Sequence, residues 1–570
     1  MLEQKDLNIQ SLSAAEKEKL CEELRRKIIE TVTACGGHLS SNLGVVELTV
    51  GMFSVFDFPR DKVVWDVGHQ CYAYKLLSGR YDAFSTLRQK GGLSGFPKRK
   101  ESAYDCYDTG HAGNSVSAAM GLAKAFDLKG EPRRVIAVIG DGSFNNGLIY
   151  EALNGLSVLG VKILIVLNDN DMSISPTVGG THELLVQSAK SGELKKKNIA
   201  LIEQYGVKYI GVVNGNDLGE VTAALKEADA FLKTTSVLLH IKTKKGMGYD
   251  FCEENPVKTH GVAPDGAIAE REYSSIFGEK MLELAGKDGR VVAVTAAMTD
   301  ALGLRPFFNT YPDRSFDVGI CEENAAVLCA AMAQGGLKPY YAIYSTFLQR
   351  AFDELIHDVS AQDLPVTFCI DRGGVSGADG ETHQGVFDLS YLSLIPNIAV
   401  AVPKDGEELA DLLEFSLTYD HPLAIRYPRS ARAAFGRRRK VGIGTFEYLT
   451  EKSNADLTVL AAGERAISLA FDLRKETGVP FDIVNARFVK PLDEELLKDI
   501  SSPRILTIED NVLHGGLGDQ IDRFYLNSGK RIDNFAYYDK FIPQGGISQL
   551  QEEYGWDRAR MVACILNEKP

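Results

Sequence analysis

The feature that most constrains this chain is a series of short, continuous apolar runs that alternate with helix-like segments. Among them are "VVWDVG" from Val63, "VIAVIG" from Val135 and "KILIVLN" from Lys162. A strand with one solvated face alternates apolar and polar residues, whereas a strand of a parallel sheet covered by helices is apolar throughout. The sequence therefore predicts an α/β fold with mostly parallel sheets.

The apolar runs fall into three series along the 570 residues, a length sufficient for several domains. A polar segment at about 244–270 separates the first two series, and we interpret it as a linker. The stretch around Arg437-Arg438-Arg439 separates the last two, and we interpret it as a second, solvated linker rather than a binding patch. We expect three tandem α/β domains with the bounds 1–262, 270–435 and 444–570.

Charge and composition exclude several classes of function. The net charge of −14 disfavours a nucleic-acid partner and an anionic membrane surface. The start, "MLEQKDLNIQ", lacks the features of a signal peptide, and no apolar run has the length of a membrane span. Nine cysteines without a CxxC spacing indicate free thiols in a reducing compartment. We therefore expect a cytoplasmic protein with no membrane and no nucleic-acid partner.

Two oxygen-rich clusters follow two of the apolar runs. Gly140-Asp141-Gly142 comes after "VIAVI", and Asn168-Asp169-Asn170 comes after "KILIVL". Parallel strands place their ligands at their carboxyl ends, so the two clusters can face one point. One carboxylate and one amide oxygen, completed by a diphosphate, suit Mg²⁺. Alone, each cluster is more often a plain turn or loop; together they favour a binding site.

This pair of clusters resembles the thiamine-diphosphate fingerprint, a GDG followed about thirty residues later by an asparagine-containing cluster. The resemblance implies that Asp141 and Asn170 bind Mg²⁺ through their side chains and Met172 through its backbone carbonyl. It also implies that Gly142 and Ser143 lie against the diphosphate of the cofactor.

Thiamine enzymes also use a glutamate beside the aminopyrimidine ring, usually in a second domain. "FDVGICEENAA" supplies Glu322 after an apolar strand, and "YAIYSTFLQRAFDEL" supplies Tyr344, Phe347 and Arg350 at the next strand-to-helix turn. A glutamate at a strand end is alone a weak signal, and its place one domain after the metal cluster strengthens it.

The resemblance becomes longer and more specific when further motifs are included. "GGHLSSNLGVVELTVGM", "WDVGHQCYAYKLLSGR", "HDVSAQDLPVTFCIDRGGVSGADGETHQGVFDLSYL", "IRYPR" and "RFVKPLDEELL" resemble the 1-deoxy-D-xylulose-5-phosphate synthase family over nearly the whole chain. The resemblance implies a transketolase-like fold, a homodimer, and the thiamine-dependent decarboxylation of pyruvate. The two-carbon unit would pass to D-glyceraldehyde 3-phosphate, as the first step towards isoprenoid precursors.

The resemblance also implies roles for individual residues. The catalytic set is Glu322, His38, His383, Asp379 and Arg350. Contacts to the phosphate of the acceptor would come from Arg372, Arg429 and Tyr344. Contacts to the cofactor would come from His69, Gly110, His111, Ala112, Gly142, Ser143, Asn170, Tyr249, Glu322 and Phe347. A histidine in a turn is more often a structural hydrogen-bonding group, and the motif context reverses that preference for His38, His69 and His383.

Several positions depart from the family pattern. Glu323 and Asn324 stand where Gln-His is usual, and a second acid beside Glu322 would raise its proton affinity if the side chains converge. Ala112 and Gly113 replace two hydroxyl residues near the diphosphate. The other departures are Asn216 and Glu254.

These changes keep two further hypotheses open. One is a related acyloin-forming thiamine enzyme with an altered donor or acceptor. The other is a catalytically idle paralogue that binds the cofactor and serves as a partner subunit. The retained Asp141, Asn170 and Glu322 favour the synthase.

Overall fold

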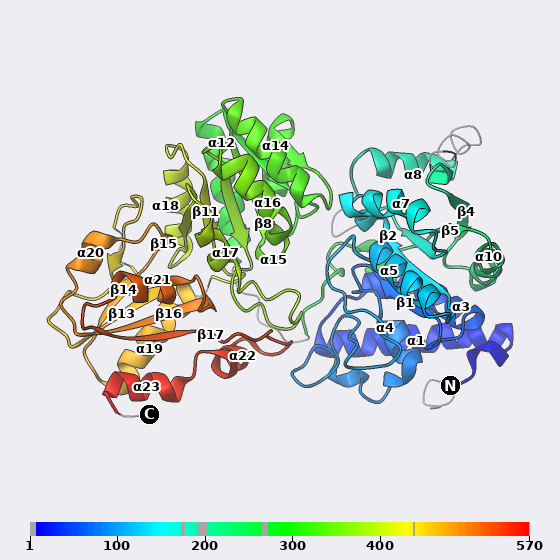
Figure 1. Ribbon diagram of the computed structural model, residues 1–570, viewed down its shortest axis with the longest axis horizontal. Coiled ribbons are helices and arrows are strands. Elements are labelled where there is room, and N and C mark those ends of the chain that lie inside the picture. The colour runs from blue at the N-terminus through cyan, green and yellow to red at the C-terminus, as the bar shows by residue number, and fades with distance from the viewer. Residues whose placement is uncertain are drawn as a thin grey trace. The chain divides into compact units, whose positions relative to one another are not determined.

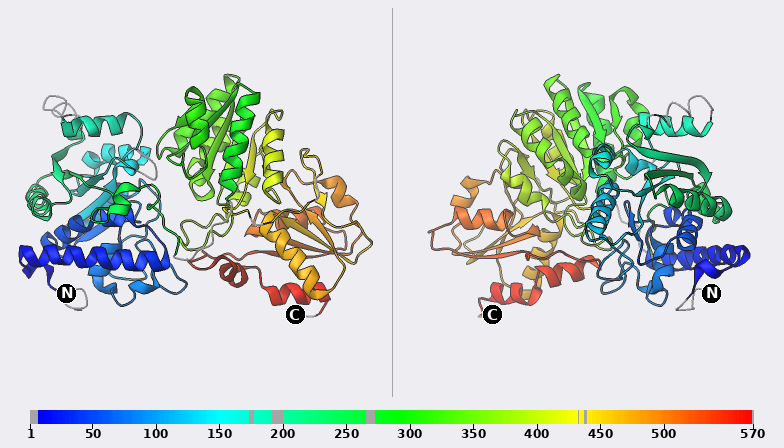
Figure 2. Two further views of the ribbon diagram at one scale, coloured as in Figure 1. Left: turned by 180° about the vertical axis from the view of Figure 1, so that it is seen from behind. Right: turned by 45° about the vertical axis from the view of Figure 1, so that its right-hand side comes forward.

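A computed structural model describes residues 7–172, 177–190, 200, 202–264, 272–431, 433–436 and 439–568. The chain divides into two compact units. Unit 1 comprises residues 1–267 with 319–321, and unit 2 comprises residues 268–318 with 322–570. Each unit is α/β, with helices on both sides of its sheets (Figures 1 and 2).

Unit 1 contains one fully parallel sheet with the strand order β1-β2-β3-β5-β4. Its strands are β1 (Lys62–Trp65), β2 (Val135–Gly140), β3 (Leu164–Asp169), β4 (Val207–Asn214) and β5 (Ser236–Lys242). Its helices are α1 (Ala14–Cys35), α2 (Ser40–Leu43), α3 (Val46–Val55), α4 (Tyr72–Lys75), α5 (Ser115–Leu128), α6 (Asp141–Phe144), α7 (Gly147–Leu159), α8 (Gly180–Lys190), α10 (Leu218–Phe231) and α11 (Asp250–Glu254).

The continuous apolar runs are explained by two separate cores on the two faces of this sheet. On β2, Ile136 and Val138 join the core that includes α1, α3 and α10. The alternating residues Val135, Ala137 and Ile139 join the core that includes α5 and α7. Because both faces are buried, no strand position is left for a polar side chain until the strand ends. The prediction of parallel, doubly covered sheets is confirmed.

Unit 2 contains two sheets, and most of their strands are parallel. The first has the order β15-β10-β11-β9-β8-β6-β7 and the second the order β12-β14-β13-β16-β17. The strands are β6 (Val291–Thr295), β7 (Ser315–Asp317), β8 (Lys338–Tyr344), β9 (Thr367–Asp371), β10 (Ala399–Ala401), β11 (Leu423–Arg426), β12 (Glu447–Tyr448), β13 (Leu457–Ala462), β14 (Asp482–Asn485), β15 (Phe488–Lys490), β16 (Arg504–Val512) and β17 (Arg531–Tyr537).

The helices of unit 2 flank these two sheets. They are α12 (Tyr273–Lys287), α13 (Arg305–Thr310), α14 (Glu322–Gln334), α15 (Ser345–Leu348), α16 (Phe352–Glu354), α17 (Asp388–Leu394), α18 (Gly406–Ser416), α19 (Glu464–Thr477), α20 (Glu494–Lys498), α21 (Leu517–Phe524), α22 (Ile547–Tyr554) and α23 (Arg558–Leu566). Short 3-10 and π segments occur in both units: in unit 1 at Ile9–Ser11, Leu76–Arg80 and Phe84–Thr86, and in unit 2 at Pro312–Arg314, Gln349–Ala351 and Leu355–Ser360.

Two segments have a structure that the sequence analysis did not predict. The run "FDIVNARF" from Phe481 reaches into two strands: β14 pairs with β13 in one sheet of unit 2, and β15 pairs antiparallel with β10 in the other. The segment 244–270, which we interpreted as a linker, packs on unit 1 in its described part. Gly37 and Val262 exchange backbone hydrogen bonds of 2.9 and 2.7 Å, so this stretch is part of the folded unit.

The change of sheet between β14 and β15 occurs at a buried charge cluster around Arg487. The Arg487 side chain is fully buried; its Nε lies 3.3 Å from Glu408 Oε1 and its Nη2 lies 3.3 Å from Glu447 Oε2. Lys404 Nζ adds a contact of 2.5 Å to Glu447, and Arg487 Nη1 donates to the carbonyl of Arg439 at 3.1 Å. Because all these charges have partners, the chain can cross between the sheets through a dry region.

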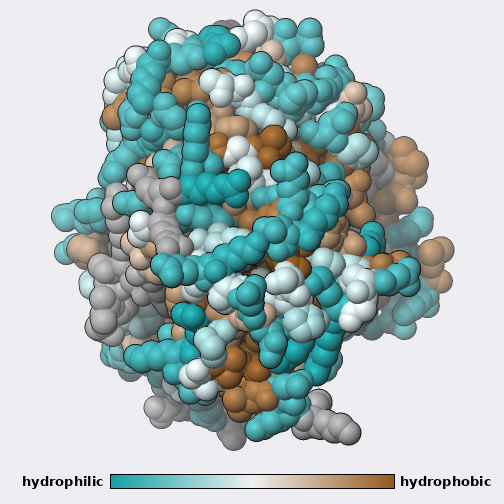
Figure 3. Space-filling model, turned by 90° about the vertical axis from the view of Figure 1, so that its left-hand side faces the viewer, coloured by the Kyte–Doolittle hydropathy of each residue, from teal (hydrophilic) through white to brown (hydrophobic). Residues whose placement is uncertain are grey.

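The face shown in the space-filling view is mostly hydrophilic, with hydrophobic residues interspersed among charged ones (Figure 3). None of the helices in the described part of the chain combines the length and apolarity that crossing a bilayer requires. The nine cysteines all lie within the described ranges and form no disulfide.

Replacing Arg487 with methionine is expected to destabilise unit 2 by about 3–5 kcal/mol, because the buried carboxylates of Glu408 and Glu447 each lose a guanidinium partner. Urea unfolding of the full chain measures the change. Arg558→Met is the matched control: it removes an exposed ion pair with Glu476 and should cost less than about 1 kcal/mol. Equal losses in the two variants would show that the buried cluster has no special weight.

Candidate active site

The two clusters at the strand ends of unit 1 lie side by side. Gly140 at the end of β2 pairs with Asn168 of β3, so Asp141 and Asn170 leave the sheet at neighbouring positions. The Asp141 carboxylate accepts hydrogen bonds from the backbone N–H of Asn170 and, at 2.7 Å, from the hydroxyl of Thr177. The Asn170 side-chain oxygen accepts the backbone N–H of Met172 at 3.1 Å. The structure thus brings together the three residues that the resemblance implies for Mg²⁺.

The environment of these groups is dry and strongly charged. Burial raises the pKa of Asp141 to about 7, against the opposing effect of the Thr177 hydrogen bond. Burial also acts on Asp169, but hydrogen bonds from His240 and Lys242 lower the pKa of this carboxyl to about 2. Asp169 is therefore an anion already neutralised by Lys242, whereas Asp141 accepts hydrogen bonds from neutral donors and is the carboxylate that a cation can bind.

The donor set at this strand end fits a magnesium diphosphate. Asp141, Asn170 and the Met172 carbonyl supply one carboxylate and two neutral oxygens, which leaves coordination positions for phosphate oxygens and water. Within the described ranges, no group of three or more histidine, cysteine, aspartate or glutamate side chains is arranged to hold a metal ion.

A buried acid that sequence reasoning missed organises the neighbouring loop. The Asp66 carboxylate accepts the backbone N–H of Gly113 at 3.0 Å and that of Ser115 at 3.1 Å, and the Ser143 hydroxyl also donates to it. Gly113 has φ +88°, and a Cβ there would lie 2.4 Å from Asn146 Oδ1. Through Gly113 and Ser115, Asp66 fixes the end of the loop that carries Gly110, His111 and Ala112. It also holds Ser143, which the resemblance places at the diphosphate.

Three imidazoles form a triangle in unit 1. The ring centroid of His38 lies 5.1 Å from that of His69 and 5.4 Å from that of His260, and the centroids of His69 and His260 are 5.2 Å apart. Burial, with Lys245 and the other two histidines, lowers the pKa of His260 well below its ordinary value, so this ring is neutral. His260 was missed because it lies in the segment that we interpreted as a linker.

Two further residues complete the picture of unit 1. Lys245 is buried, and burial lowers the pKa of its ammonium group to about 8, while Asp141 raises it. Tyr249 is the exposed N-cap residue that precedes α11, and its ring centroid lies 6.3 Å from that of Phe251. The repeated lysines of "KTKKGMGY" were the signal that could have indicated Lys245.

Glu322 is the first residue of α14 in unit 2 and is 3% exposed. Its Oε2 accepts no hydrogen bond from the residues that the structure describes, and Arg350 Nε lies 3.5 Å from it. Burial raises the pKa of Glu322 to about 7; Arg350 lowers it and Glu323 raises it. The expected effect of Glu323 is thus present, but burial is the dominant cause. An orphaned, protonatable oxygen of this kind suits a ring nitrogen of the cofactor.

An aromatic series lies at the next strand end of unit 2. Tyr344 and Phe347 stack with ring centroids 5.6 Å apart, and the edge of His383 meets Phe347 at 5.8 Å. The guanidinium of Arg372 lies 4.3 Å from the centre of the Tyr344 ring, and its Nη2 donates to the Tyr344 hydroxyl at 2.9 Å. These four residues come from the ends of the parallel strands β8 and β9 and from the segments that follow them, with Phe347 in α15.

Arg429 belongs to the same neighbourhood but is exposed and paired with Glu272, with 2.8 Å between Arg429 Nε and Glu272 Oε1. Burial raises the pKa of Asp371 to about 7, and both Arg372 and Arg429 oppose that rise. Asp379 is half-buried in the loop that also carries His383. The guanidinium groups of Arg372 and Arg429 therefore both contribute positive charge near Asp371, at the end of β9.

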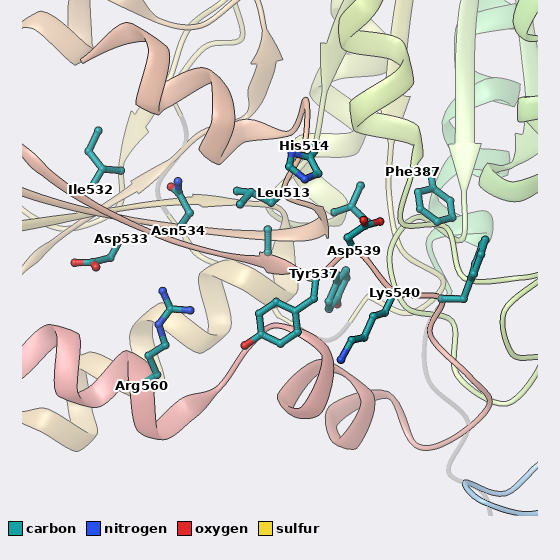
Figure 4. A pocket seen from close by; sticks show the side chains of 14 residues that line it. Phe387, Leu513, His514, Ile532, Asp533, Asn534, Tyr537, Asp539, Lys540 and Arg560 are labelled. Carbon is teal, nitrogen blue, oxygen red and sulfur yellow. The ribbon is translucent and has the colours of Figure 1, made fainter. Parts of the chain in front are cut away.

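A separate cavity of about 670 Å³ lies in unit 2 at the edge strand β17 (Figure 4). Its lining includes Phe387, His514, Tyr537, Lys540 and Arg560. None of the site residues expected from the sequence lines it, so the cavity lies apart from the candidate active site.

Family models match three parts of the chain. Residues 3–198 match 1-deoxy-D-xylulose-5-phosphate synthase, residues 269–433 match the pyrimidine binding domain of transketolase, and residues 447–561 match the transketolase C-terminal domain. Together with the parallel sheets, these matches define a transketolase-like enzyme.

Relatives of nearly full length narrow this class. A 1-deoxy-D-xylulose-5-phosphate synthase of Clostridium botulinum is 43% identical, with 98% of this chain and 97% of that protein covered. One of Clostridium kluyveri is 42% identical, with 99% and 97% covered. A transketolase structure from Campylobacter jejuni has a TM-score of 0.46 and 18% identity, with 99% of this chain and 100% of that chain covered. The chain belongs to the 1-deoxy-D-xylulose-5-phosphate synthase family.

The raised pKa of Glu322 predicts a pH-dependent effect of Glu322→Gln on stability. Unfolded glutamate titrates near 4.3, so from there to about pH 7 the folded chain retains a proton that the unfolded chain releases. Wild-type stability therefore falls over this range, and the variant avoids the loss. Relative to wild type, the variant should gain up to about 3 kcal/mol at pH 8 compared with pH 4. Urea unfolding without cofactor measures this difference; the same difference at both pH values would contradict the assignment.

Proposed function

We propose that this chain catalyses the decarboxylation of pyruvate and the transfer of the remaining two-carbon unit to D-glyceraldehyde 3-phosphate. One C–C bond of pyruvate breaks with loss of carbon dioxide, and a new bond forms to the aldehyde carbon, giving 1-deoxy-D-xylulose 5-phosphate. The reaction is the first step of the non-mevalonate route to isoprenoid precursors. The observation that carries the proposal is the similarity to synthases of this name along almost the entire chain.

Thiamine diphosphate, when bound, supplies an electron sink for the acyl carbanion. Asp141, Asn170 and the Met172 carbonyl would hold Mg²⁺, with Gly142, Ser143 and the loop Gly110–Ala112 at the diphosphate. The buried Glu322 would exchange a proton with the aminopyrimidine ring, and its pKa of about 7 suits general acid-base exchange near neutral pH. Arg350 limits how far burial raises that pKa.

The acceptor would be bound by the residues at the strand ends of unit 2. Arg372 and Arg429 provide charge for a phosphate dianion, since guanidinium groups bind phosphate with two parallel hydrogen bonds. Tyr344 orients Arg372 through the 2.9 Å hydrogen bond and the ring contact. Asp379 and His383 would bind the hydroxyl groups of the acceptor.

The histidines of unit 1 would act on protons of the donor and the product. We assign His38 and His69 to the reacting centre and the cofactor, as the family resemblance implies, and we add His260 because its ring completes their triangle. Because the pKa of His260 is held well below its ordinary value, this ring would hydrogen-bond as a neutral imidazole, and His38 and His69 would take part in the proton transfers. Tyr249 and Phe347 would contact the cofactor rings.

We also propose that the chain works as a homodimer in the cytoplasm. The nine cysteines, none of which is in a disulfide, are in keeping with a reducing compartment. Sedimentation equilibrium of the purified chain tests the oligomeric state.

One assay separates this function from its alternatives. The purified chain is incubated with pyruvate, D-glyceraldehyde 3-phosphate, thiamine diphosphate and Mg²⁺, and carbon dioxide and pentulose phosphate are followed. We expect both products in equal amounts. Carbon dioxide without the pentulose would identify an enzyme with an altered acceptor, and cofactor binding without either product would identify an idle paralogue.

Glu322→Gln should lower kcat by about 100-fold or more, because the amide cannot exchange the proton. Cofactor affinity, measured by calorimetry, should change little. Full activity of the variant would remove Glu322 from its role.

Arg429→Ala should raise the KM for D-glyceraldehyde 3-phosphate by about tenfold to 100-fold, because the hydrogen-bonded pair between the guanidinium and the acceptor phosphate is lost. The KM for pyruvate, which has no phosphate, should be nearly unchanged. Arg305→Ala is the control, since Arg305 is also an exposed arginine of unit 2 paired with an aspartate, Asp300. Equal effects on both substrates would exclude a phosphate role for Arg429.

A further inference from the structure

The loop Arg372–Gly385, here called the acceptor loop, carries Arg372, Asp379 and His383. Its two ends are joined by an antiparallel bridge. Gly374 N–H donates to Gly385 O at 2.6 Å, and Gly385 N–H donates to Gly374 O at 2.9 Å. The bridge closes the loop at its base. The position of the loop therefore depends on the contacts of the residues next to the bridge.

Asp510 holds these residues. It lies near the end of β16, whereas the loop follows β9, which belongs to the other sheet of unit 2. Asp510 Oδ1 accepts the backbone N–H of Val375 at 3.0 Å and the hydroxyl of Tyr537. Asp510 Oδ2 accepts Arg465 Nη1 at 3.0 Å, and the same nitrogen donates to the carbonyl of Val375 at 2.7 Å. Both backbone polar groups of Val375 are thus fixed by one ion pair.

Two glycines near the start of the loop pack directly against buried charged side chains. Gly374 has φ +82°, and a Cβ there would lie 2.2 Å from the carboxyl group of Asp510. A Cβ on Gly373 would lie 2.2 Å from Arg426 Nε. The two glycines let the backbone pack directly on a buried carboxylate and a buried guanidinium, an approach that other residues do not allow.

Arg426 links Gly385, at the C-terminal end of the loop, to Asp510. Its Nη2 donates to Gly385 O at 3.0 Å and to the backbone carbonyl of Asp510 at 2.6 Å. Its Nε donates to Asp388 at 3.1 Å, and Asp388 in turn accepts the hydroxyl of Ser345 at 2.7 Å. The contact network therefore reaches from the end of β16 to α15, the helix that follows Tyr344.

We propose that Asp510 is a positioning residue for the acceptor site: it acts through Val375 and the bridge to set where Arg372, Asp379 and His383 stand. This proposal rests on the proposed function for the identity of the ligand. The Asp510 carboxylate reaches the loop through the backbone of Val375, so its effect is on the geometry of the loop. Small displacements of binding groups are sufficient to weaken recognition strongly.

The main variant is Asp510→Asn, which keeps the volume and removes the charge. We expect the KM for D-glyceraldehyde 3-phosphate to rise by about tenfold, with the KM for pyruvate changed by less than about twofold. Hydrogen–deuterium exchange of the full chain should show faster exchange in peptides that cover 373–385. A purely structural role would lower the melting temperature and move both KM values together.

Glu447→Gln is the matched control, since Glu447 is also a buried, ion-paired acid of unit 2 but contacts Lys404 and Arg487 instead of the loop. It should lower the melting temperature and leave both the ratio of KM values and the exchange of 373–385 unchanged. Tyr537→Phe is a milder second variant if Asp510→Asn does not fold: it removes one donor to Asp510 Oδ1 and should shift both readouts in the same direction.

The two readouts separate failure of this inference from failure of the proposed function. Unchanged exchange of 373–385 in both Asp510→Asn and Tyr537→Phe would overturn the inference, whatever the wild-type activity. Faster exchange with an unchanged KM for the triose phosphate, in a wild type that forms the pentulose, would also overturn it. If the wild type forms no pentulose, the proposed function fails, and the exchange data alone decide whether Asp510 holds the loop.

Discussion

The backbone pairing of parallel strands that are buried on both faces determines where chemistry can occur in this chain. Because β2 and β3 leave no polar position inside the sheet, their first polar side chains appear together, at the edge where both strands end. The same holds in unit 2, where Tyr344 and Asp371 face each other in the register of β8 and β9. The site residues are thus placed by the pairing of strands, and the loops then orient them.

Burial at these edges sets the acid–base character of the side chains. Asp141, Glu322 and Asp371 all have pKa values raised to about 7, and in each case burial is the main cause. They differ in what surrounds them: Thr177 on Asp141, Arg350 beside Glu322, and two arginines around Asp371. Carboxyl groups that are similarly buried, one in unit 1 and two in unit 2, are therefore specialised by their partners.

The sequence predicted the strands, the parallel sheets and the adjacency of Asp141 and Asn170 because these depend on local apolar runs and on register. It did not predict the split between β14 and β15, because Arg487 is read as a surface residue unless Glu408 and Glu447 are known to surround it. His260 and Asp66 were missed for a related reason. Their partners lie in segments distant along the chain, so no spacing reveals them, and Asp66 was hidden inside an otherwise apolar motif.

The antiparallel pairing of β15 with β10 has a consequence for how such chains can be divided or recombined. A break between residues 436 and 444 separates the middle and last sequence series, yet it leaves the edge of the middle sheet without its outer strand. An uncovered edge offers backbone groups to any other strand and invites association with foreign chains. Exchange of last domains between relatives therefore transfers a structural element of the middle domain as well, and a functional hybrid requires that the borrowed strand match β10.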